Sequence, residues 1–334
     1  MRSSATKSPD DARYSRGFAT SLTALLRANE LVLFLVLVAL LAIGFVLNPR
    51  FLSLDNLKVT TRDSAILGIA AIGVSFTILT GGIDLSIGSM VGLGGILVAL
   101  FIQNWGLPIW LSMFLTLGIA LIIGLIHGLF VTKLHMHGFL ITLVTLGVAR
   151  GFCLVITNAF PITGLPPEFN AIGQGVVLGI FPIPVLICVG IALIMYYLLR
   201  FSYVGRQIYA VGGNMEAARL SGINVDTRIM LCYIISSMCA VLVGMIQAAR
   251  LTMGHPGTGE GYELLAITAC ILGGLSLMGG QGSLIGVIIG TLLIGTLQNE
   301  MIILNINPYW HKIVISFVLL VAISVDYLRR RRRA

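Results

Sequence analysis

Seven polar side chains lie within or beside long apolar stretches of this sequence, where they could bind a solute. They are Asp84, Arg150, Asn158, Gln247, Gln298, Asn299 and Glu300. Amide, guanidinium and carboxyl groups provide the directional hydrogen bonds that a neutral, hydroxyl-rich ligand requires. The same groups could instead pair with one another, because buried charges need partners; Arg150 could pair with Glu263 or Glu300. Lining of a solute pathway and structural pairing are both compatible with the sequence.

Asp84 is an isolated acid that follows Gly81 and Gly82 in an almost uncharged stretch. An ionisable group at membrane depth is a functional candidate by default, here for gating or coupling. The structural alternative, which we favour, is that Asp84 caps a helix beginning at Leu85 and satisfies backbone N–H groups exposed by the glycine break. A role as a direct proton carrier is less expected, because no second acid or histidine lies nearby in the sequence.

The sequence lacks the motifs of catalysis and nucleotide binding. The phosphate-cradling pattern G-x-x-x-x-G-K-[ST] is absent, and no catalytic serine, cysteine or metal constellation is recognisable. His135 and His137 flank Met136 without a third ligand, and the five cysteines have no paired spacing. We therefore expect no enzyme activity, no cofactor and no metal on this chain.

The composition predicts an all-α polytopic membrane protein whose surface contacts lipid. Hydrophobic residues make up 57% of the chain, charged residues only 10%, and the mean hydropathy is +1.00. Soluble domains have roughly 25% charged residues, and each membrane span needs roughly 20 apolar ones. We expect about ten spans, each meeting that length requirement with some tolerance. They are 31–47, 64–80, 85–102, 109–132, 138–157, 180–199, 229–249, 263–279, 284–304 and 311–328.

The distribution of basic residues predicts the orientation. The chain has 21 lysines and arginines against 13 acids, a net charge of +8. The basic residues concentrate in an N-terminal tail (1–30), in a loop (200–228) within the transmembrane domain (31–328), and in a C-terminal tail (329–334). Cytoplasmic segments are enriched in lysine and arginine, so we expect both termini and the loop to be cytoplasmic. The positive charge then requires no nucleic-acid partner.

The loop 200–228 carries the signals of a short helix. They are the N-cap Asn214, the first-turn acid Glu216, the helix formers Ala217, Ala218 and Arg219, and the left-handed stop Gly222. These residue types begin, extend and end helices at such positions. A helix of about two turns is unstable alone in water, so other parts of the protein must hold it. We interpret it as a docking element for a soluble partner.

Two glycine-rich segments, 80–95 and 272–290, share the skeleton G-G-x-x-L-x-x-G. The correspondence suggests an internal repeat in which spans 2–5 are echoed by spans 7–10, as in many transporters. Close packing between helices is the more general explanation, because small residues let backbones approach. The glycines for which we expect this packing role are Gly81, Gly82, Gly88, Gly273, Gly274, Gly282, Gly286 and Gly290.

Three segments, 81–89, 205–223 and 261–286, resemble the permease subunits of bacterial ABC importers for monosaccharides. That group includes ribose, arabinose, xylose and autoinducer-2 systems, and the resemblance extends over nearly the whole chain from about Asn29 onward. It implies a permease in the bacterial inner membrane that pairs with a second copy or a sister permease. It also implies two cytoplasmic ATPase subunits or a tandem ATPase, which bind ATP and Mg²⁺, and a periplasmic or lipid-anchored sugar-binding protein.

Within this resemblance, the short helix of the loop corresponds to the E-A-A-x-x-x-G element, which is expected to sit in a groove of the ATPase. The matching residues are Glu216, Ala217, Ala218 and Gly222. The longer I-x-L-P ending of the importer motif is absent here, as is usual for the sugar branch.

The function implied by the resemblance is translocation of a monosaccharide, driven by the separate ATPase. The solute would be a pentose or a related sugar, with autoinducer-2 as an option because 162–169 and 307–312 are somewhat similar to that branch. An ion-coupled secondary transporter is the alternative, with Asp84 and Glu300 as the only plausible beginnings of an ion site. The sequence does not distinguish among solutes, nor a homodimer from a heterodimer.

Overall fold

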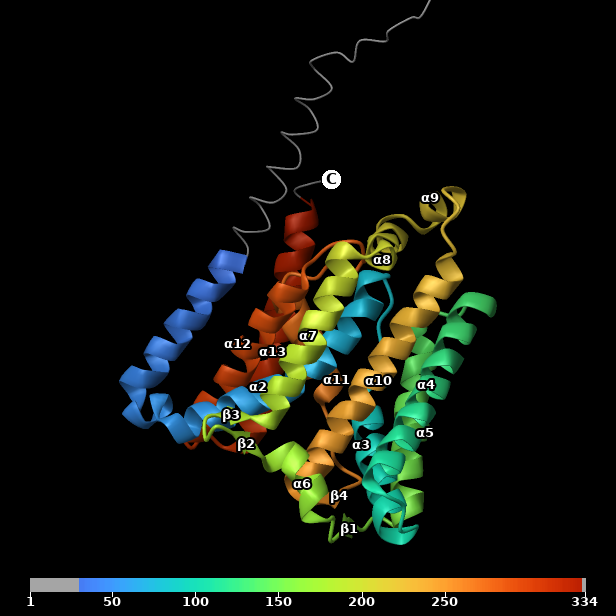
Figure 1. Ribbon diagram of the computed structural model, residues 1–334. Helices are drawn as coiled ribbons and strands as arrows, with labels where there is room; N and C mark the ends of the chain where they lie inside the picture. The colour runs from blue at the N-terminus through green and yellow to red at the C-terminus, as the bar shows by residue number, and fades with distance from the viewer. Residues whose placement is uncertain (1–29, 332–334) are drawn as a thin grey trace, which may run out of the picture.

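The described part of the chain is almost entirely helical (Figure 1). The computed structural model describes residues 30–331, so most of the two expected polar tails, residues 1–29 and 332–334, lies outside the described residues. The helices are Glu30–Leu47, α2 (Leu54–Leu79), α3 (Ile87–Ala99), α4 (Ile109–Lys133), α5 (Gly138–Thr157), α6 (Pro167–Gln174), α7 (Ile183–Phe201), α8 (Tyr203–Gly213), α9 (Met215–Leu220), α10 (Val225–Leu251), α11 (Tyr262–Leu272), α12 (Leu284–Ile303) and α13 (Pro308–Arg331). The smaller elements are the 3₁₀ turn η1 (Pro49–Leu52), the π turn η2 (Leu100–Asn104) and the two-residue strands β1 (Ile162–Thr163), β2 (Val176–Val177), β3 (Phe181–Pro182) and β4 (Met253–Gly254).

Nine helices within residues 30–331 are long and apolar enough to cross a membrane, which confirms an all-α membrane protein. One of the ten expected spans, 263–279, is broken. Only α11 is helical there, and its 11 residues rise about 16 Å, roughly half of a bilayer core. Beyond it the chain turns at Gly274, and Gly279 and Gly280 also have positive φ. A right-handed helix needs negative φ, so these glycines end the helix that hydropathy predicted to continue.

α2 and α10 begin earlier than the apolar runs from which they were predicted. The expected spans began at residues 64 and 229, whereas the helices begin at residues 54 and 225. Ser53 Oγ accepts the N–H of Asn56 at 3.4 Å, and Asn224 Oδ1 accepts that of Thr227 at 3.1 Å. These capping side chains start both helices in polar turns, which a hydropathy pattern does not detect.

The centre of the bundle consists of α2 and α10. α10 packs against α2, α3 and α4, and α2 packs in addition against α7, α11 and α12. Ile72 and Phe76 of α2 and Ile246 of α10 are completely buried. The first helix and α13 are the least buried of the long helices, and their exposed side chains are mostly apolar. Apolar exposure of this kind is stable against lipid tails, which are as apolar as leucine.

The two ends of the bundle carry different polar structures. At one end, the lower one in Figure 1, β1 pairs antiparallel with β4 and β2 with β3, close to α6. We call this the β1 end. At the other end lie α8, α9 and the described ends of the first and last helices. We call this the α9 end. Which of the two ends faces the cytoplasm stays a prediction.

Candidate functional site

α9 forms where the sequence predicts a capped helix. Asn214 Oδ1 accepts the N–H of Ala217 at 2.9 Å, which satisfies a backbone donor at the start of the helix. At the other end, the Ile223 N–H donates to Ala218 O at 3.1 Å across Gly222, whose φ is +81°. This is the glycine-ended pattern of helix termini. The prediction of a short capped helix within the loop is confirmed.

A small hydrophobic cluster holds α9 to the bundle. Ala218 is only 4% exposed, and it packs with Val211 of α8 and with Val225, Ile229 and Tyr233 of α10. Six residues of helix have no stability of their own. This cluster therefore holds α9 in place.

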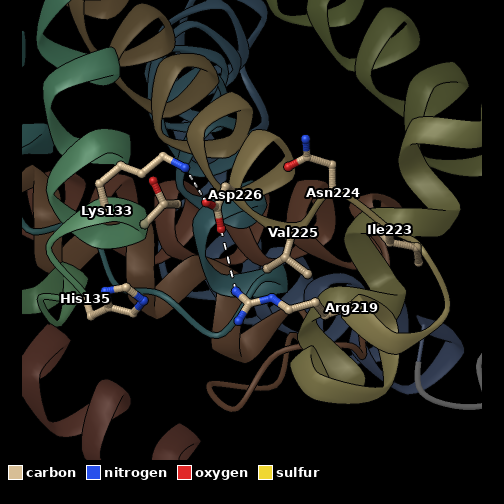
Figure 2. A pocket seen from close by; sticks show the side chains of 8 residues that line it. Lys133, His135, Arg219, Ile223, Asn224, Val225 and Asp226 are labelled. Atoms are coloured by element: carbon tan, nitrogen blue, oxygen red, sulfur yellow. Dashed lines mark hydrogen bonds and ion pairs between the residues drawn. The ribbon is translucent and has the colours of Figure 1, made fainter.

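An ion-paired aspartate fixes α9 from the side. Asp226, at the start of α10, lies between Lys133 Nζ at 2.7 Å and Arg219 Nη2 at 3.6 Å (Figure 2). These three residues line a cavity of ≈ 370 Å³. Both basic side chains are more than half exposed, so each pair contributes at most about 1 kcal/mol and orients α9 more than it stabilises the fold. Sequence reasoning missed this site, because Lys133 and Asp226 are 93 residues apart.

The outer surface of α9 is bare. Leu220 is 90% exposed and Met215 is 42% exposed, while Glu216 and Arg219 are also exposed. A single exposed apolar residue is ordinary. Here, however, a helix held through one alanine turns both of its large apolar side chains outward. The arrangement presents a short mixed polar and apolar surface outside the membrane-spanning bundle.

Asp84 is completely buried and joins two elements. Its Oδ1 accepts the backbone N–H of Ser86 at 2.9 Å and the Ser86 hydroxyl at 2.6 Å. Its Oδ2 accepts the hydroxyl of Ser236, on α10, at 2.6 Å. The helix begins at Ile87 and not at Leu85, whose N–H donates to the hydroxyl of Thr142. The cap geometry is thus present in part, and the contact with α10 is an addition that the sequence did not suggest.

Arg150 makes different contacts from those expected. Its guanidinium donates to backbone carbonyls: to Pro256, to Thr258 at 2.9 Å and to Gly88 at 3.2 Å. The ion pair with Glu263 or Glu300 that the sequence offered as one alternative is not formed among the described residues. The carbonyls of Pro256 and Thr258 are available because the loop 255–261 is not helical, and a carbonyl accepts from a cation without a second buried charge. Arg150 therefore ties α5 to α3 and to this loop.

Two of the expected pathway residues meet at one cavity. Gln298 and Asn299 line a space of ≈ 160 Å³ toward the β1 end, together with Asp63, Leu67, Tyr262, Leu265, Gly295, Ile302 and His311. Gln247 reaches the same region, because its amide donates to the hydroxyl of Tyr262 at 2.6 Å. Asp63 is ion-paired with Arg250. The cavity offers amide, carboxyl and phenol groups, which suit a hydroxyl-rich solute.

The other expected pathway residues lie apart from this cavity. Asn158 is exposed and ends α5 in a left-handed conformation. Glu300 is nearly buried, and its Oε1 has no hydrogen-bond partner among the described residues. Asp84 and Arg150 make the contacts given above. Within residues 30–331, no group of three or more histidine, cysteine or acidic side chains is placed to hold a metal ion.

Several of the expected packing glycines lie at close contacts, whereas a Cβ atom on Gly274 would meet nothing within 4 Å. A methyl group on Gly286 would overlap Gly273 O, and one on Gly290 would overlap Ala269 O, so α12 packs directly on α11. Gly82 lies beside the Tyr233 hydroxyl and Gly88 beside Gly259 O. Gly81, Gly274 and Gly282 have positive φ values of +80°, +89° and +131°. The internal repeat stays a prediction, although both glycine-rich segments leave the helical conformation.

A membrane-spanning helical bundle that presents a short capped helix outside itself defines a polytopic membrane protein with an exposed helix at one end. Comparison with known proteins gives the family. The model described as "Branched-chain amino acid transport system / permease component" matches residues 56–323. The chain belongs to this family of ABC importer permeases.

Several curated permeases are similar over most of the chain. The ribose import permease protein RbsC of Haemophilus influenzae is 40% identical, over 88% of this chain and 91% of that protein. The D-allose transport system permease protein AlsC of Escherichia coli is 36% identical, over 88% and 90%. The autoinducer 2 import system permease protein LsrC of an Enterobacter strain is 35% identical, over 90% and 88%. No solved structure matches.

Membership of this family has consequences for the whole chain. It is a non-catalytic, multi-pass membrane subunit of a bacterial importer. An importer of this kind also requires an ATPase and a binding protein as partners.

Proposed function

We propose that this chain forms the translocation pathway for a monosaccharide in the bacterial inner membrane and is driven by ATP hydrolysis on a separate subunit. The observation that carries the proposal is α9, a capped helix held by one buried alanine with Met215 and Leu220 exposed. A sugar or related compound as the transported solute is supported by the names of the relatives, which refer to ribose, D-allose and autoinducer 2. Ribose is the first solute to test, because RbsC has the highest identity of these three.

The proposed assembly follows from the position of α9. The α9 end faces the cytoplasm together with both termini, and α9 enters a groove of an ATPase subunit that binds ATP and Mg²⁺. A second copy of this chain or a sister permease completes the pair, and a sugar-binding protein docks at the β1 end. ATP-driven movement of α9 then alternates access to a pathway that includes the cavity at Gln298 and Asn299.

The docking role of α9 is tested by charge reversal at two matched glutamates. Glu216 lies in the first turn of α9 and Glu168 in the first turn of α6, at the opposite end of the bundle, and both are exposed. Reversal costs each helix the same favourable dipole interaction, about 0.3–1 kcal/mol. We expect Glu216→Lys to lose the ATPase and ATP-dependent ribose uptake, whereas Glu168→Lys keeps the ATPase.

The measurement is affinity purification of each variant from its native host in mild detergent, with the co-purifying subunits identified by mass spectrometry. Equal ATPase recovery with both variants would contradict docking through α9. If the wild-type chain retained no ATPase at all, the assignment of the energy source would be wrong.

A further inference from the structure

α8 connects α9 directly to the glycine-rich segments of the bundle. It ends at Gly213, and Asn214 alone separates it from the first residue of α9. One face of α8 is buried through Gly205, Gln207, Ile208 and Val211. The first turn of α10 is tied to α8 as well, because Arg228 Nε donates to Gln207 Oε1 at 2.6 Å. A displacement of α9 therefore acts directly on α8 as well as on α10.

Three backbones meet at the end of α8. A Cβ atom on Gly212 would overlap Leu79 O, at the end of α2, and would lie 2.5 Å from Gly280 N, in the segment between α11 and α12. The Gly280 N–H donates to Leu79 O at 2.9 Å. We call Leu79, Gly212 and Gly280 the glycine junction. Main-chain atoms in direct contact have no side chains between them that could deform, so a displacement is passed on without being absorbed.

A side chain of α8 strengthens the same connection. Tyr209 Oη donates to Gly282 O at 3.0 Å, two residues beyond Gly280. Burial raises the pKa of Tyr209 above its ordinary value, and the opposing effect of Arg200 is smaller. The phenol therefore stays protonated and remains a hydrogen-bond donor throughout the physiological pH range.

α2, together with α11 and α12, which flank the segment of Gly280, also encloses the cavity of ≈ 160 Å³ toward the β1 end. Asp63 and Leu67 belong to α2, Tyr262 and Leu265 to α11, and Gln298 and Asn299 are among the residues from α12. A shift of α2 relative to α11 and α12 at one end of the bundle must change their relation at the other end, because helices move as rigid rods. The two places are connected through these three helices.

We propose that the glycine junction transmits the movement of α9 to α2 and to the segment between α11 and α12, and that Gly212 is a positioning residue for ATP-driven transport. This inference rests on the proposed function, in which an ATPase moves α9. It assigns to Gly212 and Tyr209 a role that is separate from docking, since neither residue lies in α9.

Two adjacent glycines of α8 provide the test. Gly212→Ala places a methyl group against Leu79 O, whereas a methyl group on Gly213 meets nothing within 4 Å. Both changes give α8 the same gain in helix propensity, so the pair differs only in the junction. We expect Gly212→Ala to retain the ATPase while ribose taken up per ATP hydrolysed falls about two- to thirtyfold, the range for residues that carry coupling without touching either ligand. Gly213→Ala should match the wild type.

The readouts are ATPase retention on purification, together with ATP hydrolysis and ribose uptake in proteoliposomes that contain the assembled importer. Tyr209→Phe is the milder second variant, because it removes one hydrogen bond and adds no volume; it should lower uptake per ATP in the same direction. If Gly212→Ala does not accumulate in the membrane, Tyr209→Phe decides alone. The inference would be overturned if a variant that assembles showed the same uptake per ATP as the wild type. The proposed function would remain intact in that case, provided that the wild type binds the ATPase.

Discussion

At the scale of single residues, Asp84 shows how this bundle accommodates a buried acid. The carboxylate accepts three hydrogen bonds, two from Ser86 and one from Ser236. A buried charge without such donors would be strongly unfavourable. The bond from Ser236 spans 152 residues of sequence, so it joins the turn before α3 to α10. The acid therefore acts as a link between elements.

Two neighbouring serines of α10 give a stability prediction. Ser236→Ala leaves Asp84 Oδ2 without its donor, and removal of one partner of a buried polar group costs about 1–3 kcal/mol. Ser237 is equally buried, but its hydroxyl has no hydrogen-bond partner among the described residues. We expect Ser236→Ala to lower the unfolding temperature in detergent and Ser237→Ala to leave it unchanged or raise it.

Unfolding of the two serine variants can be followed by the reaction of the five cysteines with a fluorescent maleimide. All five are free and buried, so they should react only when the fold opens. Identical melting curves for both serine variants would show that Ser236 does not stabilise Asp84.

At the scale of elements, α11 and α12 depend on glycine for their contact. α11 is too short to cross the membrane alone, so its position depends on packing against α2, α12 and α13. Gly290 lies directly against the backbone of α11. Small residues allow this approach in membranes, where association relies on van der Waals contact.

Gly290→Ala should separate the two helices. The added methyl group would overlap Ala269 O and lie 3.0 Å from Gly273 N, and overpacking of this kind costs about 1–3 kcal/mol. Gly147→Ala on α5 is the matched control, since a methyl group there meets nothing within 4 Å. We expect a lower unfolding temperature for Gly290→Ala only, measured by the same maleimide reaction. A loss of equal size in the Gly147 variant would assign the effect to the helix backbone and not to the α11–α12 contact.

At the scale of the whole molecule, the proposed energy source is ATP hydrolysis on a separate subunit. Asp84 and Glu300, the two acids that an ion-coupled transporter could use, lie in different surroundings: Asp84 is bonded to serines, and Glu300 Oε1 lies close to Gly44 and Phe51. α9, by contrast, is exposed and held in a defined orientation at one end of the bundle. This arrangement favours drive by a docked partner over drive by an ion gradient.

Reconstitution distinguishes the two energy sources. Proteoliposomes that contain this chain alone should take up no ribose under a proton or sodium gradient, because an ABC importer permease depends on its ATPase partner for energy. Vesicles with the co-purified ATPase, the binding protein and ATP should accumulate it, measured as radiolabelled ribose retained on filters. Gradient-driven uptake by the chain alone would contradict the proposed function and direct attention to Asp84 and Glu300.

The sequence by itself determined the features that depend on neighbouring residues. Apolar runs gave the long helices, because a bilayer requires a continuous apolar length. Asn214 and Gly222 gave the limits of α9, because caps act within a few residues. The glycine-rich segments were correctly singled out as places of close packing, although hydropathy carried the expected span 263–279 past the end of α11.

Only the tertiary structure decided which distant groups meet. The Asp63–Arg250 pair spans 187 residues, and the contact of Arg150 with Pro256 O spans 106. The glycine junction likewise joins three segments that no local pattern connects. Such contacts depend on how helices pack, and packing is set by the summed fit of many side chains. For this reason the limits of α9 can be predicted from the sequence, while only the structure shows its connections to the bundle.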